Sequence, residues 1–409
     1  MSLTRKIMIS LVLGIGTGLL LNRFHTPWID TYVIQGAIEV GSQIFMASLK
    51  LMVIPLVFVS LVTGTGSLQD VKKLGRIGLK TFILYTLTTG IAIAGAIIIA
   101  HLTNPGLNFN LTPSQPVELN NKMSIVDMLI SIFPSNPIES MAKGEVLQVI
   151  IFAILFGIGI TMSGEKGQRV LNFFHDLNEV ILNMVIYLIH FAPIGVFCLL
   201  VKVFATQGFA AILPMAKYFF TVILVLLFHA IFLYGSMLKF IAKLRPLSFI
   251  KKFKEVWVFA FSTSSSNATI PLNLETCEHK LGIDKSVSSF VIPFGATINM
   301  DGTAIMQGVA VVFVAQAYGI PLGISEYLMV ILTATLASIG TAGVPSVGLV
   351  MLAMVFNQVG LPVEGIGIII GVDRLLDMLR TCVNITGDAV VGCIVAKTEN
   401  KMNEEVFYS

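Results

Sequence analysis

The sequence predicts an all-α membrane protein in which many helices cross the bilayer. Hydrophobic residues make up 55% of the 409-residue chain and charged residues only 12%, whereas a soluble domain usually carries about 25% charged residues. The mean hydropathy is +0.88. No polar stretch is long enough to form a separate soluble domain, so a water-soluble fold is excluded.

Apolar segments of membrane-spanning length follow one another through the first 240 residues or so. We interpret them as ordinary helices, and the weakly apolar region 122–140 as part of a broken or tilted fourth span. The first segment begins like a signal peptide but has no convincing cleavage site, so it is kept as a helix. The segments are 6–22, 37–65, 77–101, 146–164, 170–204 and 213–242.

Lysine and arginine residues occur in short clusters between the apolar segments, the pattern of cytoplasmic loops. The loop 103–121 carries neither residue, as expected on the outside. The net charge of +3 therefore does not indicate nucleic-acid binding. We expect a multi-pass protein of the plasma (inner) membrane with both termini cytoplasmic. The clusters are Arg5 and Lys6; Lys72, Lys73, Arg76 and Lys80; Lys166 and Arg169; Lys239, Lys243, Arg245, Lys251, Lys252 and Lys254; Lys397 and Lys401.

The chain changes character after about residue 245, where small polar residues, glycine and proline interrupt the apolar runs. The runs 257–274 and 326–356 contain STSSSNATIP and SIGTAGVP, and each precedes an apolar segment with a polar centre. Helix breaks at membrane depth occur only where protein or water covers them. Paired interrupted segments point to the binding site of a transporter. We interpret the two runs as re-entrant hairpins of a doubled unit.

The last apolar segment, 362–396, carries six polar side chains on one helical stripe. At about 100° per residue they fall within an arc of roughly 100°, and the rest of the helix is largely aliphatic. Ionisable residues inside a membrane are costly and functional by default; an ion pair that merely joins helices is the alternative. Arg374 lies off the stripe and its role is ambiguous. The stripe consists of Asp373, Asp377, Arg380, Thr381, Asn384 and Asp388.

This stripe suits a zwitterion that bears an extra carboxylate. The planar guanidinium of Arg380 can bind a carboxylate through two hydrogen bonds, and the neighbouring Asp, Thr and Asn side chains can hold an ammonium group. Asp388 has no obvious cationic partner in the sequence, which favours a bound cation. Sodium prefers oxygen ligands, and unwound carbonyls beside a carboxylate form such a site.

These motifs resemble the sodium-dependent glutamate/aspartate transporter family, also called dicarboxylate/amino acid:cation symporters. The serine-rich run, NMDGT, SIGTAGVP and DxxRTxxNxxGD occur in the expected order, and the likeness covers essentially the whole chain. It implies eight transmembrane helices plus two re-entrant helical hairpins, assembled as a homotrimeric elevator-type transporter. The implied segments are 1–76 and 103–205 for a fixed scaffold, 77–102 and 206–398 for a moving transport domain, and 399–409 for a cytoplasmic tail.

The resemblance also implies a site for L-aspartate or L-glutamate and three sites for Na+, the co-transported ion. Arg380 would bind the side-chain carboxylate of the substrate and Asp377 its amino group. Thr381, Asn384 and Thr303 would add hydrogen bonds, and the hairpin tips would close over the substrate with Ser265, Ser266, Gly343 and Val344. The implied sodium ligands are Asp388, Gly295, Asn299 and Asn384; Thr297, Ser338, Ile339 and Thr341; and Asp301, Asn299, Tyr85, Thr88 and Thr89.

Two positions depart from the family pattern. Asn267 stands where many relatives have another serine, which bears on the substrate backbone contact or the inner gate. Gln307 stands where the animal glutamate carriers have a glutamate linked to proton coupling. Proton coupling of that kind is therefore not expected, and potassium coupling is left open.

Other functions are compatible with parts of this pattern. A C4-dicarboxylate, neutral amino acid or cystine symporter would share the fold, but Arg380 disfavours a neutral substrate and Asp377 favours an amine. An ion channel lined by the polar helix is a more distant alternative. No nucleophile–base pair, HExxH motif or phosphate loop supports an enzyme. Four cysteines without a CxxC motif predict neither disulfides nor a zinc site, and the six histidines are assigned to core or interface positions.

Overall fold

The computed structural model describes residues 3–24, 26–66, 75–107, 109, 111, 133–339 and 347–409. Within these residues the chain is helical, without β-strands apart from one isolated bridge. The predicted all-α class is confirmed. Five of the described helical stretches are long and apolar enough to cross a membrane, as expected of a multi-pass protein. They are Arg5–Arg23, Ile29–Gly66, Arg76–Thr103, Ala192–Ile241 and Lys285–Ala317.

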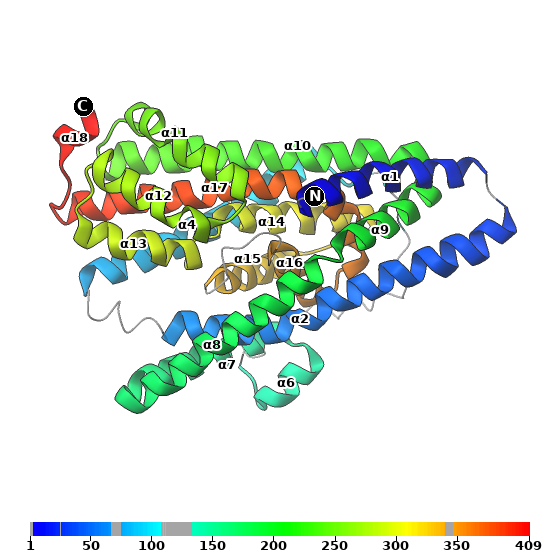
Figure 1. Ribbon diagram of the computed structural model, residues 1–409, viewed down its shortest axis with the longest axis horizontal. Coiled ribbons are helices and arrows are strands. Elements are labelled where there is room, and N and C mark those ends of the chain that lie inside the picture. Colours follow the sequence, from blue (N-terminus) through cyan, green and yellow to red (C-terminus); the bar gives the residue numbers. More distant parts are fainter. Residues whose placement is uncertain are drawn as a thin grey trace.

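The helices within residues 3–66 and 137–207 form one packed group (Figure 1). Helix α1 packs along α9, and α2 contacts α7, α8 and α9. The expected fourth span at 122–140 falls largely outside the described residues, which include the short helix α6. The bounds are α1 Leu3–Arg23, η1 Ile29–Ile38, α2 Glu39–Gly66, α6 Pro137–Lys143, α7 Val146–Met162, α8 Gly164–Ile189 and α9 Ala192–Gln207.

The apolar run 170–204 is not the single ordinary helix that we expected. Helix α8 ends at Ile189, and α9 begins at Ala192. Pro193 stands in the first turn of α9, where its missing N–H leaves no helical hydrogen bond unmade. The chain therefore starts a new helix at the proline.

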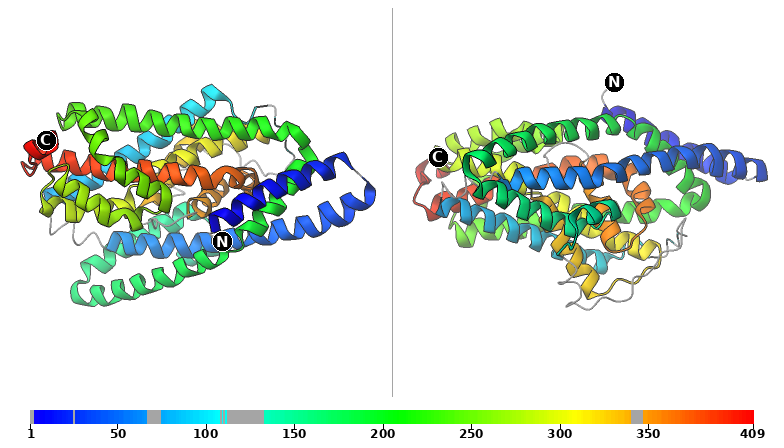
Figure 2. Two further views of the ribbon diagram at one scale, coloured as in Figure 1. Left: turned by 45° about the horizontal axis from the view of Figure 1, so that its top comes forward. Right: turned by 90° about the horizontal axis from the view of Figure 1, so that it is seen from below.

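The second half of the chain packs around α17, together with α4 (Figure 1 and Figure 2). Most residues of α14 and α17 are buried. Helix α14 lies close to α4, because a Cβ atom at Gly308 would sit 2.9 Å from Ala96 Cβ and 3.1 Å from the Ile93 carbonyl. Small residues permit such close approach of membrane helices. The bounds are α4 Arg76–Thr103, η2 Gly208–Ala211, α10 Ile212–Phe228, α14 Asp301–Ala317, η5 Val363–Gly365 and α17 Ile366–Thr398.

Two of the predicted helix breaks are confirmed. Ser264 has φ 51° and ends α11 in the left-handed region, and Ser265 caps α12 by accepting a hydrogen bond from Ala268 N. Asn299 and Met300 separate α13 from α14. The third predicted break, in SIGTAGVP, lies mostly outside the described residues. The bounds are α11 Pro246–Thr263, α12 Ser266–His279, α13 Lys285–Ile298, α15 Ile324–Ser338 and α16 Val347–Gln358.

The span predicted at 213–242 is not a regular α-helix. After α10 the backbone widens into two π-helical segments, η3 (His229–Tyr234) and η4 (Met237–Ile241). Such wide turns rotate the side chains that follow them and are frequent at functional sites. Here η3 directs the side chains of its first and last residues, His229 and Tyr234, into the protein core, where both are buried.

The C-terminal residues fold back onto the helix ends instead of forming a free tail. Helix α18 (Glu404–Tyr408) lies against α11, where the Lys252 ammonium donates to the Val406 carbonyl. Glu399 accepts hydrogen bonds from Lys80 and from Arg76 Nη2, the latter at 2.6 Å. These two cations lower the pKa of the Glu399 carboxyl.

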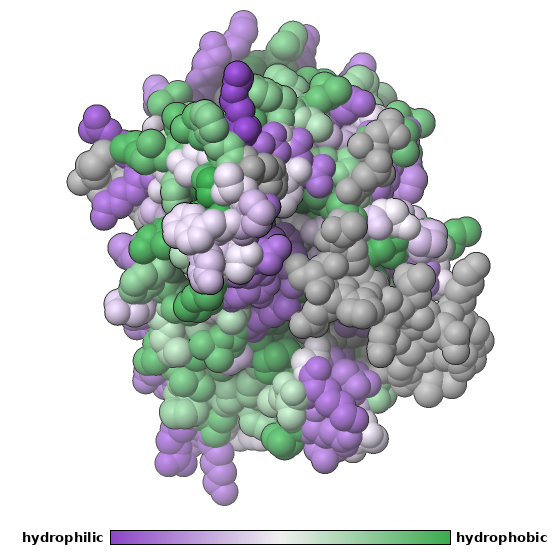
Figure 3. Space-filling view, turned by 90° about the vertical axis from the view of Figure 1, so that its right-hand side faces the viewer, coloured by the Kyte–Doolittle hydropathy of each residue, from purple (hydrophilic) through white to green (hydrophobic). Residues whose placement is uncertain are grey.

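Figure 3 shows the end of the molecule that lies opposite the C-terminus. Hydrophilic side chains lie there among hydrophobic ones.

Candidate functional site

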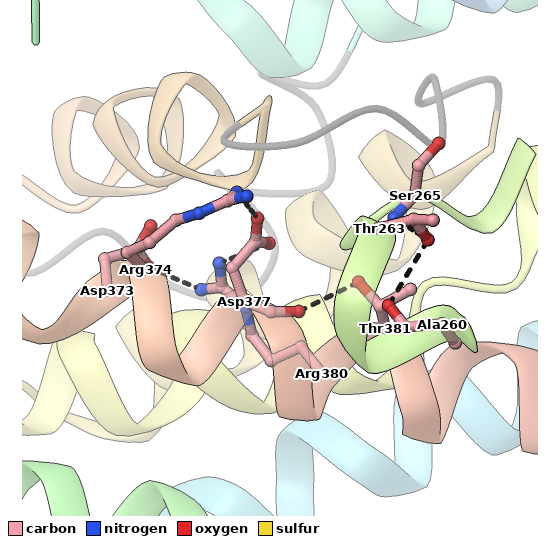
Figure 4. A network of polar contacts seen from close by, with 8 residues as sticks. All are labelled: Ala260, Thr263, Ser265, Asp373, Arg374, Asp377, Arg380 and Thr381. Atoms are coloured by element: carbon pink, nitrogen blue, oxygen red, sulfur yellow. Dashed lines mark hydrogen bonds and ion pairs between the residues drawn. The ribbon is translucent and has the colours of Figure 1, made fainter. Parts of the chain in front are cut away.

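The polar stripe predicted on the last helix is buried along α17. Arg380 is 1% exposed, although its side chain is among the longest in the chain. Its Nη1 donates to Asp373 Oδ1 at 2.7 Å and its Nη2 to Asp377 Oδ1 at 2.8 Å (Figure 4). A buried cation is tolerated when geometry and hydrogen bonds compensate its desolvation. The two carboxylates supply that compensation at positions seven and three residues before the arginine.

Asp377 is the centre of this network. Its other carboxylate oxygen lies 3.4 Å from Arg374 Nη1, and its backbone carbonyl accepts a hydrogen bond from Thr381 Oγ1 at 2.8 Å. The residue therefore stands between two guanidinium groups. Arg374, whose role the sequence left ambiguous, is an ion-pair partner at the edge of the stripe.

Other helices pack close to α17 around Arg380. A Cβ atom at Gly348, on α16, would lie 3.1 Å from Thr303 Cγ2 and 3.8 Å from Arg380 Nη2. Helix α14 approaches so closely that a side chain at Gly302 would collide with the Arg380 backbone carbonyl. Helices α11 and α12 also pack on α17. Figure 4 shows the end of α11 with Ser265 on the Thr381 side of the network.

A second cluster lies one turn further along α17. Asn299 Nδ2 donates to the Asn384 carbonyl at 3.0 Å and to Asp388 Oδ1 at 2.9 Å. The Asn384 side chain accepts from Gly302 N at 2.7 Å. A side chain at Gly295 would collide with Asp388, so this glycine brings the α13 backbone against the carboxylate. The structure thus brings together all four residues assigned to the first sodium site.

This second cluster contains oxygens that are suited to a cation. Asp388 Oδ2 and Asn299 Oδ1 are buried and have no hydrogen-bond partner among the described residues. Leaving a buried charged oxygen unpaired is costly, and a bound Na+ ion would offset that cost. The residues present therefore fit the predicted ion.

Asp301 forms a third cluster, with partners that the sequence did not reveal. Thr89 Oγ1 donates to Asp301 Oδ1 at 2.5 Å, so two of the residues assigned to the third sodium site lie together. The other oxygen of Asp301 lies 3.1 Å from His229 Nε2 and accepts from the Tyr234 hydroxyl at 2.7 Å. The π-helical segment η3 thus places its first and last residues on one carboxylate.

The sequence gives only a weak indication that His229 and Tyr234 contact Asp301. His229 is an ionisable residue inside an apolar run, a pattern that marks functional positions in membrane helices. The sequence predicts a core or interface position for it, as for the other histidines, and the structure buries it. Its partner lies 72 residues away in the sequence, and the wide turn that directs Tyr234 to the same carboxylate has no counterpart in the helical periodicity.

Other predicted site residues have mostly local contacts. The Tyr85 hydroxyl donates to the Val291 carbonyl at 3.0 Å, and Thr88 bonds within its own helix. Thr297 and Ser338 likewise donate to carbonyls of their own helices, at 2.9 Å and 2.7 Å. Ile339 and Ser266 are buried. Thr341, Gly343 and Val344, from the second tip, lie outside the described residues.

The comparisons with known proteins decide the family. Residues 3–398 match the sodium:dicarboxylate symporter family. The chain belongs to this family. It is 35% identical to the proton/sodium-glutamate symport protein of Geobacillus stearothermophilus, with 98% of this chain and 95% of that protein covered. It is 34% identical to the proton/glutamate-aspartate symporter of Escherichia coli (strain K12), with coverage of 99% and 94%. Excitatory amino acid transporter 2 of Homo sapiens is 33% identical, with 86% and 71% covered.

Within this family member, the Asp301 cluster makes a direct prediction about stability. Tyr234→Phe removes one hydrogen bond to a buried carboxylate, so the free energy of unfolding should fall by about 1.5–3 kcal/mol. Denaturant unfolding of the purified protein in detergent measures this change. Tyr318→Phe is the matched control, because the Tyr318 hydroxyl makes no hydrogen bond with the described residues, and it should change stability little. Equal effects of the two variants would contradict the role given to Tyr234.

Proposed function

We propose that this protein is a sodium-coupled secondary active symporter of an acidic amino acid, L-aspartate or L-glutamate. The observation that carries the proposal is the buried guanidinium of Arg380, held between two aspartates and next to Thr303. A guanidinium at this depth is a strong, directional site for a carboxylate. The relatives named for glutamate or aspartate transport support the choice of substrate.

The substrate would enter this network by exchanging ion pairs. Its side-chain carboxylate takes the place of an aspartate on Arg380, and its ammonium group pairs with Asp377, which the exchange releases. A neutral amino acid would give Arg380 no new carboxylate. A C4-dicarboxylate would give Asp377 no cation. The two groups together therefore favour a zwitterion with a second carboxylate over the other substrates of this fold.

Sodium would bind at the oxygens of the other two clusters. Asp388, with Asn299, Gly295 and Asn384, offers a carboxylate and carbonyl oxygens. Asp301, with Thr89 and the neighbouring Tyr85 and Thr88, offers another set. A further site would use Thr297, Ser338, Ile339 and Thr341. Names of relatives include both proton and sodium coupling, and Gln307 in place of an acidic side chain favours sodium here.

Asn384 provides a physical link between substrate and ion. Its backbone carbonyl accepts from Asn299 and its side chain from Gly302, while Thr381 and Arg380 lie within one turn of it. A change at the ion cluster therefore shifts groups that surround the substrate. Coupling of this kind is reciprocal, so sodium and substrate raise the affinity of each other by the same factor.

The movement would be an elevator-type displacement within a homotrimer. The separate packing of the helices within 1–76 and 103–205, on one hand, and 77–102 and 206–398, on the other, supports a fixed scaffold and a moving transport domain. The two groups meet where α9 and α1 contact α17 and where α2 contacts α16. The residues that bind substrate and ions all belong to the proposed moving part.

Calorimetric titration of the purified protein tests the proposed function. L-aspartate, L-glutamate, succinate and L-serine are titrated in sodium buffer and in choline buffer. Heat that appears only with aspartate or glutamate, and only with sodium, supports the symporter. Heat with succinate or serine, or binding that ignores sodium, refutes the substrate or the ion. Currents in liposomes without saturable, sodium-dependent uptake would instead indicate a channel.

Arg380→Ala should remove the carboxylate site. Binding of aspartate and glutamate should weaken by at least about 2–5 kcal/mol, or thirty-fold or more in affinity. Arg380→Lys keeps the charge but loses the planar fork, so an intermediate loss is expected, and circular dichroism establishes that both variants are folded. Arg169→Ala, an exposed change on α8, is the control. Intact acidic amino acid binding by folded Arg380→Ala protein would disprove the site.

Asp388→Asn should weaken the dependence of substrate binding on sodium. The substitution keeps the shape of the side chain but removes the negative charge that a cation would neutralise. Substrate affinity is measured over a series of sodium concentrations, and the steep rise expected of the wild type should become shallower. Asp176→Asn, on the exposed side of α8, is the matched control. An unchanged sodium response in Asp388→Asn would exclude this residue as a ligand.

A further inference from the structure

A long apolar groove runs behind the substrate and ion clusters, on the other side of α17. It lies between α10 with η3, α11 and α17 and encloses about 580 Å³. Its walls are almost entirely aliphatic or aromatic, and include Ile223, Leu226, Leu247, Trp257 and Val383. The groove opens sideways, because Leu247 is 71% and Ile231 61% exposed. The mouth of the groove therefore opens onto the outer surface of the helix bundle.

Basic residues are close in sequence to several residues that line this groove. The lining residues Leu238, Pro246 and Ile250 are each next or close in sequence to a lysine or arginine. Residues 229–254 contain six Lys or Arg residues and no Asp or Glu. Lys239, Lys243 and Lys251 are exposed and form no ion pair with any described residue. The Lys239 ammonium lies over the Phe240 ring, 5.4 Å from its centroid.

We propose that this groove binds one anionic phospholipid of the surrounding bilayer. An acyl chain lies in the apolar groove, and the phosphate-bearing headgroup meets Lys239, Lys243 and Lys251 at its end. The apolar walls match a hydrocarbon chain, and clustered basic residues beside membrane helices attract acidic headgroups. The proposal rests on the combination of an apolar groove with exposed, unpaired cations near one end of it.

The lipid would touch elements that hold the transport site together. Tyr234 lines the groove and also donates to Asp301. Trp257 on α11 donates from Nε1 to Thr386 Oγ1 on α17 at 2.8 Å, and both residues line the groove. An acyl chain wedged beside this contact restrains α11, the first arm of the first hairpin, against α17. The site therefore offers the bilayer composition a way to influence the hairpin.

The groove contains its own fluorescent reporter. The chain has two tryptophans, so a Trp28→Phe background leaves Trp257 as the single one. This variant is placed in nanodiscs of phosphatidylcholine that contain a minor fraction of brominated phosphatidylglycerol or, separately, brominated phosphatidylcholine. Bromine quenches only nearby tryptophan. We expect phosphatidylglycerol to quench Trp257 at much lower mole fraction than phosphatidylcholine, with apparent affinities that differ by roughly fivefold for each contributing cation.

Two sets of variants distinguish specific lipid binding in the groove from a general effect of positive surface charge. Replacing Lys239, Lys243 and Lys251 by Gln should abolish the preference for phosphatidylglycerol, whereas Lys166→Gln with Arg169→Gln, on exposed α8 positions, should not. Gly235→Leu should reduce quenching by both lipids, because a Cβ at this groove residue meets no atom within 4 Å and extends the side chain into free space. Gly95→Leu, equally unobstructed on α4, is its control.

Three outcomes would overturn the proposal. The first is equal quenching by the two brominated lipids in the wild-type groove. The second is an equal loss of preference in the α8 charge variant, which would mean that only the surface potential is being measured. The third is undiminished quenching in Gly235→Leu, which would place the lipid outside the groove. All readouts measure lipid binding, so they stand whether or not the protein carries an acidic amino acid.

Discussion

The burial of Arg380 between Asp373 and Asp377 sets the main constraint on the structure. A charge at the centre of a bilayer costs at least a few kcal/mol, so the guanidinium must have carboxylate partners and must be kept from lipid. Both partners come from the same helix, at spacings that bring them onto one face. The other helices then have to cover that face. This is why α17 is the inner helix around which α10, α11, α13 and α14 pack.

Helix breaks follow from the same constraint. A continuous helix beside the polar face of α17 would use all its backbone groups internally and present only side chains. The break at Asn299 instead frees backbone and amide groups that bond with α17, as Gly302 N does with the Asn384 side chain. Non-helical backbone is tolerated at this depth only when protein satisfies it. Glycine at 302 is required because any side chain there would meet the Arg380 backbone.

Sequence periodicity was sufficient for the elements whose patterns are local. The polar stripe of α17 and the breaks at Ser264 and Asn299 could be predicted, because residue spacing and helix-breaking composition specify them. The pairing of Asp301 with His229 and Tyr234 could not, because it depends on a widened turn and on contacts between distant segments. The docking of α18 could not be predicted for a related reason, because it depends on which neighbours the chain meets after folding. The restart of the helix at Pro193 has a local cause, the proline itself, but the apolar run that continues on both sides of it predicts a single span.

The buried aspartates of α17 differ in whether a fixed cation compensates their charge. Arg380 and Arg374 compensate Asp373 and Asp377, but Asp388 has no basic partner among the described residues and keeps one buried oxygen without a hydrogen bond. Ordinary charge pairing would have placed a lysine or arginine there. In the proposed mechanism a mobile cation takes that place, which would allow the charge of the core to change as substrate enters and leaves. Asn384 contacts both the Asp388 cluster and the α14 turn beside Arg380. It is therefore the residue through which the proposed sodium site and the proposed substrate site would influence each other.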